Sequence, residues 1–108
     1  PLNVDEVISL MRYRLGVTYD LQLVVRRDRL YLQLMWAYLE QQSFPMDEET
    51  YRVHVNEVLE VINRLGLADE VSEWLEIMNK KTRLGKALSL RLRAEGLLEE
   101  FLLDSTDR

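Results

Sequence analysis

The sequence predicts an α+β fold in which a small sheet of about three strands carries helices on one face. Apolar and polar residues alternate over 19–26 and 29–36, and a third alternation follows over 86–92, which is the period of β-strands. Apolar residues recur every three or four positions over 4–15 and on both sides of Gly66, which is the period of helices. Because a lone hairpin is only marginally stable, we expect the helices to cover one face of the sheet.

Capping residues delimit the expected helices. Asn3 precedes the first helix and can accept hydrogen bonds from its amides, and Gly16 follows it as a residue that tolerates left-handed backbone. Asp47 and Gly66 delimit a second helix in the same way. Asp69 is expected to cap a third helix. Because the link between the last two helices is short, we expect an antiparallel helical pair.

The two strands of the hairpin are joined by Arg26-Arg27-Asp28-Arg29, a polar turn without glycine. Asp28 is therefore expected to supply any left-handed conformation that the turn requires. Residues 37–42 fit either a continuation of the second strand or a short helical turn. Ser43-Phe44-Pro45 ends this segment on either interpretation.

A single α+β domain is expected over residues 1–103, closed by a short helix that begins near Ala94, and residues 104–108 are expected to fray. Its core is expected to combine the inward positions of the strands with the apolar stripes of the helices. The expected core residues are Leu21, Leu23, Leu32, Leu34, Trp36, Val55, Leu59, Ile62, Trp74, Leu75, Leu88 and Leu90.

Composition excludes several chemistries. The 108 residues include no cysteine, which excludes disulfides, thiolate metal sites and a cysteine nucleophile. No apolar run approaches the length of a membrane span. The net charge of −5 disfavours general binding to nucleic acid or to anionic membranes. Positive charge is nevertheless concentrated, because residues 77–93 contain six cations and no acid, and residues 26–29 contain three arginines.

The segment Arg83-Leu84-Gly85-Lys86 has three interpretations. A phosphate-binding loop needs several glycines that lead into a helix, whereas here one glycine leads into a strand. An ordinary strand-entry turn explains the segment without any ligand. A protein-docking patch is the third interpretation, because arginine forks pair well with the carboxylates of an acidic partner.

No residue pattern indicates catalysis. His54 is the single histidine, and without converging ligands it is expected to be a half-buried structural residue. The acids at helical spacing lie away from the apolar stripes, so we interpret them as solvated helix faces. We therefore expect no catalytic residue, no metal and no cofactor, and we expect that the protein is not an enzyme.

Aromatic residues crowd the second strand and the segment after it. Trp36 shares the face of the strand leucines, so core packing explains it best. Tyr31 lies on the opposite face, where it could contact a partner or stack on a base beside Arg27 and Arg29. No RNA-binding sequence motif accompanies it.

Several blocks resemble a known family. They are Tyr19-Asp20-Leu21-Gln22-Leu23, the run LYLQLMWAYLEQQSFPMDEETY over 30–51, and RLGKALSL over 83–90. Together they are similar to the domain-of-unknown-function family DUF3067, found in cyanobacteria and plant plastids. Asp47 stands where the family often has serine, and Thr82 where it usually has proline, which affects a cap and a strand end only.

The resemblance implies a protein of the cytoplasm, or of the plastid stroma in a plant, and it brings no assigned catalytic residues. It marks as family-motif positions Trp36, Tyr38, Glu40, Gln41, Phe44, Arg83 and Lys86.

From these observations we expect a non-enzymatic protein-binding or assembly module that serves a photosynthesis-related process in an oxygenic phototroph. Its partner is expected to be a protein with an acidic surface, and the chain itself a monomer or weak dimer. The expected contact residues are Arg83, Lys86, Arg27, Arg29 and Tyr31. Two alternatives are a nucleic-acid-binding domain that uses the basic patches and a small-molecule site between Trp36 and the Arg83 turn.

Overall fold

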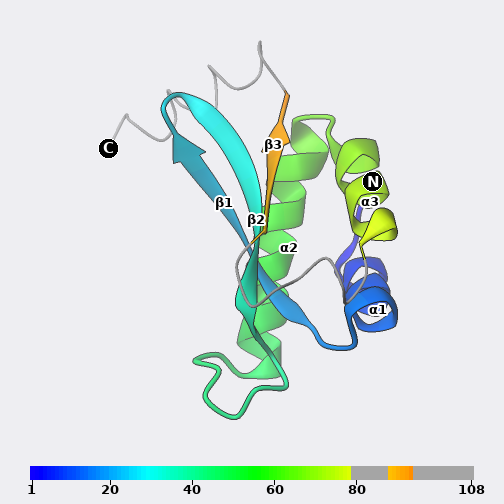
Figure 1. Cartoon of the computed structure of the whole chain (residues 1–108), viewed down its shortest axis with the longest axis vertical. Coiled ribbons are helices and arrows are strands. Elements are labelled where there is room, and N and C mark those ends of the chain that lie inside the picture. Colours follow the sequence, from blue (N-terminus) through cyan, green and yellow to red (C-terminus); the bar gives the residue numbers. More distant parts are fainter. Residues whose placement is uncertain (79–87, 94–108) are drawn as a thin grey trace.

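The computed structural model describes residues 1–78 and 88–93, apart from the side chain of Trp36, and has the expected α+β architecture (Figure 1). The elements are α1 (Val4–Leu15), β1 (Tyr19–Arg26), β2 (Arg29–Tyr38), α2 (Glu48–Arg64), α3 (Ala68–Ile77) and β3 (Leu88–Leu92). Within the described ranges, no helix is both long enough and apolar enough to cross a membrane.

The sheet has the order β1-β2-β3, and both neighbours run antiparallel to β2. Leu30 pairs with Leu92 and Leu34 pairs with Leu88, so β3 ends beside the β1–β2 turn. The register shifts between Tyr19 and Leu21, where two residues of β1 span four residues of β2, at the end of the hairpin away from the turn. The pairing of β3 with the hairpin confirms that the three predicted strands form one sheet.

Helices cover one face of this sheet. In Figure 1, α2 runs behind the strands and α1 and α3 lie to one side of it. Strand positions that face the helices are buried, including Leu21, Leu32 and Leu92. The α1 stripe completes the same core through Met11. One layer of helices therefore leaves the other face of the sheet turned away from α1, α2 and α3.

The expected core is largely correct. Leu21, Leu32, Leu34, Val55, Leu59, Ile62 and Leu75 are buried, whereas Leu23, Trp74, Leu88 and Leu90 are partly buried residues that pack against the core. Leu23, Leu88 and Leu90 lie on the two edge strands, where a residue has a neighbouring strand on one side only, and Trp74 lies on α3. The side chain of Trp36 lies outside the described part of the structure.

Most caps act as predicted. Asn3 accepts a hydrogen bond from the Glu6 amide, and Asp47 accepts one from the Thr50 amide. The backbone at Gly16 is left-handed, with φ of 86°. The prediction that Asp69 caps α3 is wrong, because the helix begins at Ala68 and Asp69 lies inside its first turn. Aspartate is favoured both at the N-cap and, through the helix dipole, in the first turn, so the residue type alone does not distinguish these two positions.

The ends of β2 and β3 differ in part from the predicted strand bounds. The segment after residue 36 continues as strand, because β2 runs to Tyr38. The predicted strand 86–92 is observed over Leu88–Leu92, and its first two residues lie outside the described ranges. The closing helix expected after Ala94 and the frayed tail at 104–108 also lie outside them.

Candidate functional site

The β1–β2 turn has an unusual backbone for its residue types. Arg27 and Asp28 have φ of 52° and 62°, so both central residues are left-handed. Positive φ at both central positions is the pattern of a type I′ turn, which favours Asn-Gly. Left-handed backbone was predicted for Asp28 but not for Arg27. An arginine is thus held at the tip of the hairpin in a conformation that its side chain disfavours.

Arginines gather around this turn on the face of the sheet that points away from the helices. Arg26 pairs with Arg29 across the turn, and Arg91 of β3 pairs with Tyr31 of β2. One position further along, Gln33 pairs with Ser89. We call this surface the arginine face. It consists of Arg26, Arg27, Arg29, Tyr31, Gln33, Ser89 and Arg91.

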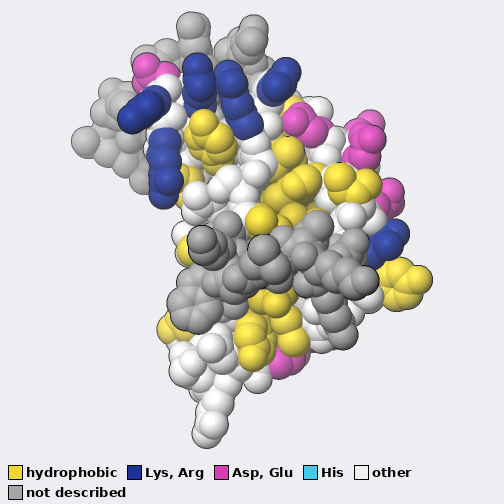
Figure 2. Space-filling model, viewed as in Figure 1, with side chains coloured by type: hydrophobic (Ala, Val, Ile, Leu, Met, Phe, Trp, Pro, Cys, Tyr) yellow, Lys and Arg dark blue, Asp and Glu magenta, His cyan; other side chains and the backbone are white. Residues whose placement is uncertain are grey.

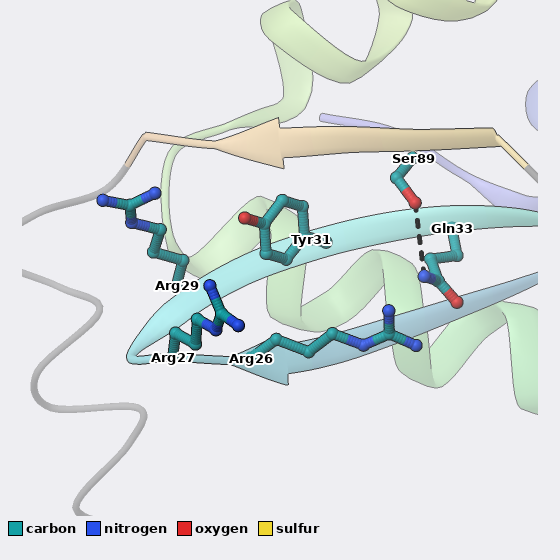
Figure 3. Close-up of a pocket in the computed structure, with 6 residues that line it drawn as sticks. All are labelled: Arg26, Arg27, Arg29, Tyr31, Gln33 and Ser89. Atoms are coloured by element: carbon teal, nitrogen blue, oxygen red, sulfur yellow. Dashed lines mark hydrogen bonds between the residues drawn. The ribbon is translucent and has the colours of Figure 1, made fainter.

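Most of the arginine face surrounds a hollow of about 450 Å³ (Figure 3). It is lined by Arg26, Arg27, Arg29, Tyr31, Gln33 and Ser89. Gln33 Nε2 donates a hydrogen bond to Ser89 Oγ at 3.2 Å, which joins β2 to β3 at one end of the hollow. In Figure 3, Arg27 and Arg29 lie at the turn end, the Tyr31 ring lies between them and the Gln33–Ser89 pair, and the Arg26 side chain extends from the turn toward Gln33.

No ion pair among the described residues involves this surface, although Asp28 stands between Arg27 and Arg29 in the turn. The ion pairs among the described residues lie elsewhere: they join Arg12 to Glu40 and Glu48, Arg52 to Asp5, and His54 to Asp20. None of them uses an arginine of the arginine face, and none of the residues that line the hollow is acidic. Figure 2 shows Lys and Arg side chains gathered at one end of the molecule, where the hairpin turn lies in Figure 1.

Three of the five expected contact residues meet here. Arg27, Arg29 and Tyr31 line the same hollow, whereas Arg83 and Lys86 lie outside the described residues. The proposed small-molecule crevice depends on Arg83 and on the Trp36 side chain, so it also lies outside them. Sequence reasoning missed the residues that the strand pairing adds, namely Arg26, Gln33, Ser89 and Arg91. Their position in the alternation, opposite to that of the buried leucines, was the available signal.

A second polar cluster lies at the other end of the hairpin, around the fully buried Thr18. The Thr18 amide and hydroxyl each donate a hydrogen bond of 2.7 Å to the Glu40 carboxylate. Arg12 Nε donates to Thr18 Oγ1 at 2.8 Å. Burial alone would raise the pKa of Glu40, but the hydrogen bonds from Thr18, assisted by the Arg12 charge, lower it below the ordinary value. Glu40 thus ties α1 and β1 to the segment after β2.

The other family-motif positions hold that segment in place. Tyr38 packs edge-on against Tyr19 with ring centres 5.7 Å apart, and Phe44 packs edge-on against Tyr51 at 5.9 Å. The Gln41 amide donates to the Tyr38 carbonyl at 3.0 Å. Burial raises the pKa of Tyr51, so its phenol stays neutral and donates to the Tyr19 carbonyl at 2.6 Å. These contacts give the motif residues a structural role.

His54 has a buried carboxylate as its neighbour. Its Nε2 lies 2.8 Å from the Leu21 carbonyl oxygen and 3.2 Å from Asp20 Oδ1. Because a carbonyl only accepts, we assign the hydrogen to Nε2, which donates to the Leu21 carbonyl, whereas Asp20 Oδ1 is buried without a hydrogen-bond partner. The other Asp20 oxygen accepts from Gln22 Nε2 at 3.1 Å. His54 is half-buried, as expected, and its contacts with Asp20 and Leu21 hold the start of β1 against α2.

Metal chemistry finds no support in the described part of the chain. No group of three or more His, Cys, Asp or Glu side chains there could hold a metal ion. Among the surfaces described above, the arginine face has the charge and the hydrogen-bond donors that suit an anion.

Comparisons with known proteins agree with the resemblance noted in the sequence. The family model described as "Domain of unknown function (DUF3067)" matches residues 5–102. The solution NMR structure of the Alr2454 protein from Nostoc sp. strain PCC 7120, a structural genomics target, is 34% identical. That alignment covers 94% of this chain and 97% of the Nostoc protein, with a TM-score of 0.79. None of the curated proteins that were compared matches this chain.

Proposed function

Since the chain belongs to the DUF3067 family, whose description assigns no function, we propose from its geometry that it is a non-enzymatic protein-binding module. Its arginine face docks an acidic segment of a partner protein. The Nostoc relative supports a role in an oxygenic phototroph, where we place this module as an accessory to a photosynthesis-related process.

One observation carries the proposal: three exposed arginines and Tyr31 line one hollow, and none of the residues that line it is acidic. A planar guanidinium pairs with a carboxylate through two parallel hydrogen bonds, and arginine is enriched at protein interfaces together with tyrosine. Tyr31 supplies apolar area in the middle of the cations, where a partner side chain can pack. The combination suits a peptide segment that carries acids around an apolar residue.

Local strain supports the same conclusion. Two features of this hairpin lower the stability of the fold: the left-handed backbone of Arg27, and the like charges of Arg26 and Arg29 opposite each other across the turn. Residues that break local rules concentrate at functional sites, where binding offsets the loss. The N-caps of α1 and α2, by contrast, are the residue types that helix starts favour.

Charge reversal tests this proposal. The double variant Arg27→Glu with Arg29→Glu replaces two of the four cations of the face by anions. Arg14→Glu with Arg64→Glu is a matched control, because it changes the net charge equally at exposed helix positions. Immobilised protein is incubated with a cyanobacterial extract, and bound proteins are identified by mass spectrometry. We expect wild type and control to retain the same acidic protein and the face variant to lose it. Equal recovery by all three proteins would contradict the proposal.

A further inference from the structure

The hollow in the arginine face has the chemistry of a phosphoryl site. We propose that it receives a phosphorylated serine or threonine of the partner protein. This inference rests on the proposed function and specifies the chemical group that the face recognises.

The donors around the hollow exceed what one carboxylate can accept. Arg26, Arg27 and Arg29 each carry a guanidinium with five N–H donors. Ser89 Oγ already accepts from Gln33, so its own hydrogen is available to a ligand, and the Tyr31 hydroxyl adds another donor. A carboxylate carries one negative charge on two oxygens, whereas a phosphoryl group carries nearly two charges on three oxygens. A phosphoryl group therefore satisfies more of these donors.

The charge of the hollow matches the same ligand. The lining residues include three cations and no acid, so an anion that enters meets no described carboxylate. A phosphoryl group placed opposite an arginine cluster gains charge-assisted hydrogen bonds, and it is bound through paired N–H groups of the guanidinium. In the turn Arg27 lies between Arg26 and Arg29, and all three side chains line the same hollow.

The extent of the basic surface favours one phosphorylated side chain over a nucleic-acid strand. Described acids line the helices, among them Glu57 and Glu60 of α2 and Glu73 and Glu76 of α3, and the whole chain has a net charge of −5. A strand of nucleic acid extends its charge well beyond a hollow of about 450 Å³, and the net negative charge of the chain disfavours it there. A single phosphoryl group needs only the hollow itself.

Three short peptides with blocked ends test the inference. They are identical except for a central serine, phosphoserine or glutamate. Each is titrated into the full chain at constant ionic strength, and backbone amide shifts are followed by NMR. We expect the phosphoserine peptide to shift the amides of Arg27, Tyr31 and Ser89 and to bind about tenfold tighter than the glutamate peptide. The serine peptide should cause no shift at these amides.

Variants make the result specific to the hollow. Arg27→Gln with Arg29→Gln should abolish the preference for phosphoserine, whereas Arg14→Gln with Arg64→Gln should keep it. The spectra of the variants also show whether each retains the fold.

The possible failures are distinguishable. Equal affinity of the glutamate and phosphoserine peptides at these amides would overturn the phosphoryl site and leave the docking of acidic segments intact. Binding of a single-stranded oligonucleotide at these amides, with no response to any peptide, would overturn both proposals. Phosphoserine shifts confined to the helices would also overturn the inference.

Discussion

Arg26 and Arg29 lie directly opposite each other as the last residue of β1 and the first residue of β2. Like charges in this position repel, and no described acid pairs with either of them. Between them, Arg27 has a φ of 52°. The turn therefore concentrates positive charge and backbone strain at one end of the sheet. A bound anion would reduce the repulsion between the arginines.

Replacing one of the opposed arginines should stabilise the protein. Arg26→Glu turns the repulsive pair into an attractive one, so we expect the free energy of unfolding to rise by roughly 0.5 kcal/mol at low salt. Urea unfolding measures the change, and high salt should reduce it by screening. Arg26→Gln removes repulsion without adding attraction and should give a smaller gain. A loss of stability in Arg26→Glu would show that the two charges do not interact as described.

The turn itself should accept a better sequence. Arg27→Asn with Asp28→Gly places the residues that favour a type I′ turn at its two central positions. We expect the free energy of unfolding to rise by about 1 kcal/mol, because the strain of left-handed non-glycine residues is relieved. The same variant should bind acidic peptides more weakly, since a cation of the hollow is lost. Unchanged binding would remove Arg27 from the site.

The Thr18–Glu40 contact should be one of the stronger polar interactions in the fold. Thr18→Val keeps the shape of the buried side chain but removes the hydroxyl that bonds Glu40 and Arg12. We expect a loss of about 1–3 kcal/mol, because a hydrogen bond to a charged group is broken. A double-mutant cycle with Glu40→Gln isolates the pair. Additive losses would show that the hydroxyl and the carboxylate are not coupled.

The lowered pKa of Glu40 predicts an acid-sensitive contribution. A carboxylate with a lower pKa in the folded state stabilises the protein above its unfolded-state pKa, and this stabilisation disappears as the pH falls through the folded-state value. Unfolding measured from neutral pH into the acid range should therefore show a shallower loss in Glu40→Gln than in wild type. Identical slopes would contradict the assigned hydrogen bonds.

Removing His54 should expose the cost of the Asp20 carboxylate, which is only 6% exposed. His54→Ala takes away the N–H near Asp20 Oδ1, and we expect a loss of about 2–3 kcal/mol in the free energy of unfolding. His54→Gln keeps a donor of similar reach and should lose less. Thermal and urea unfolding measure both variants. Equal losses would show that packing, rather than the hydrogen bond, is what His54 contributes.

Local signals made part of the fold predictable from sequence. The helix over 4–15 and the strand over 19–26 have the predicted bounds, because caps and alternation act over a few neighbouring residues. The start of α3 was predicted wrongly, because aspartate is favoured both at the N-cap and in the first turn of a helix. The end of β2 was left open. Tertiary contact decides it, through the Leu39 amide that bonds the Thr18 carbonyl at 2.8 Å.

The candidate site divides in the same way. Arg27, Arg29 and Tyr31 are close in sequence, and the hairpin alone brings them together. Ser89 and Arg91 join them only because β3 pairs with β2 in one register, which no local pattern specifies. The contact between Asp20 and His54 was not foreseen for a related reason, since it depends on how α2 packs against the start of β1.

The most direct test of the arginine face as a binding surface is an NMR titration of the full chain with a ten-residue oligoglutamate peptide. The account predicts that amide shifts concentrate at the β1–β2 turn, Tyr31, Gln33, Ser89 and Arg91, and that they weaken steeply as salt is raised. Shifts located on α1, α2 or α3, with the turn unaffected, would contradict it.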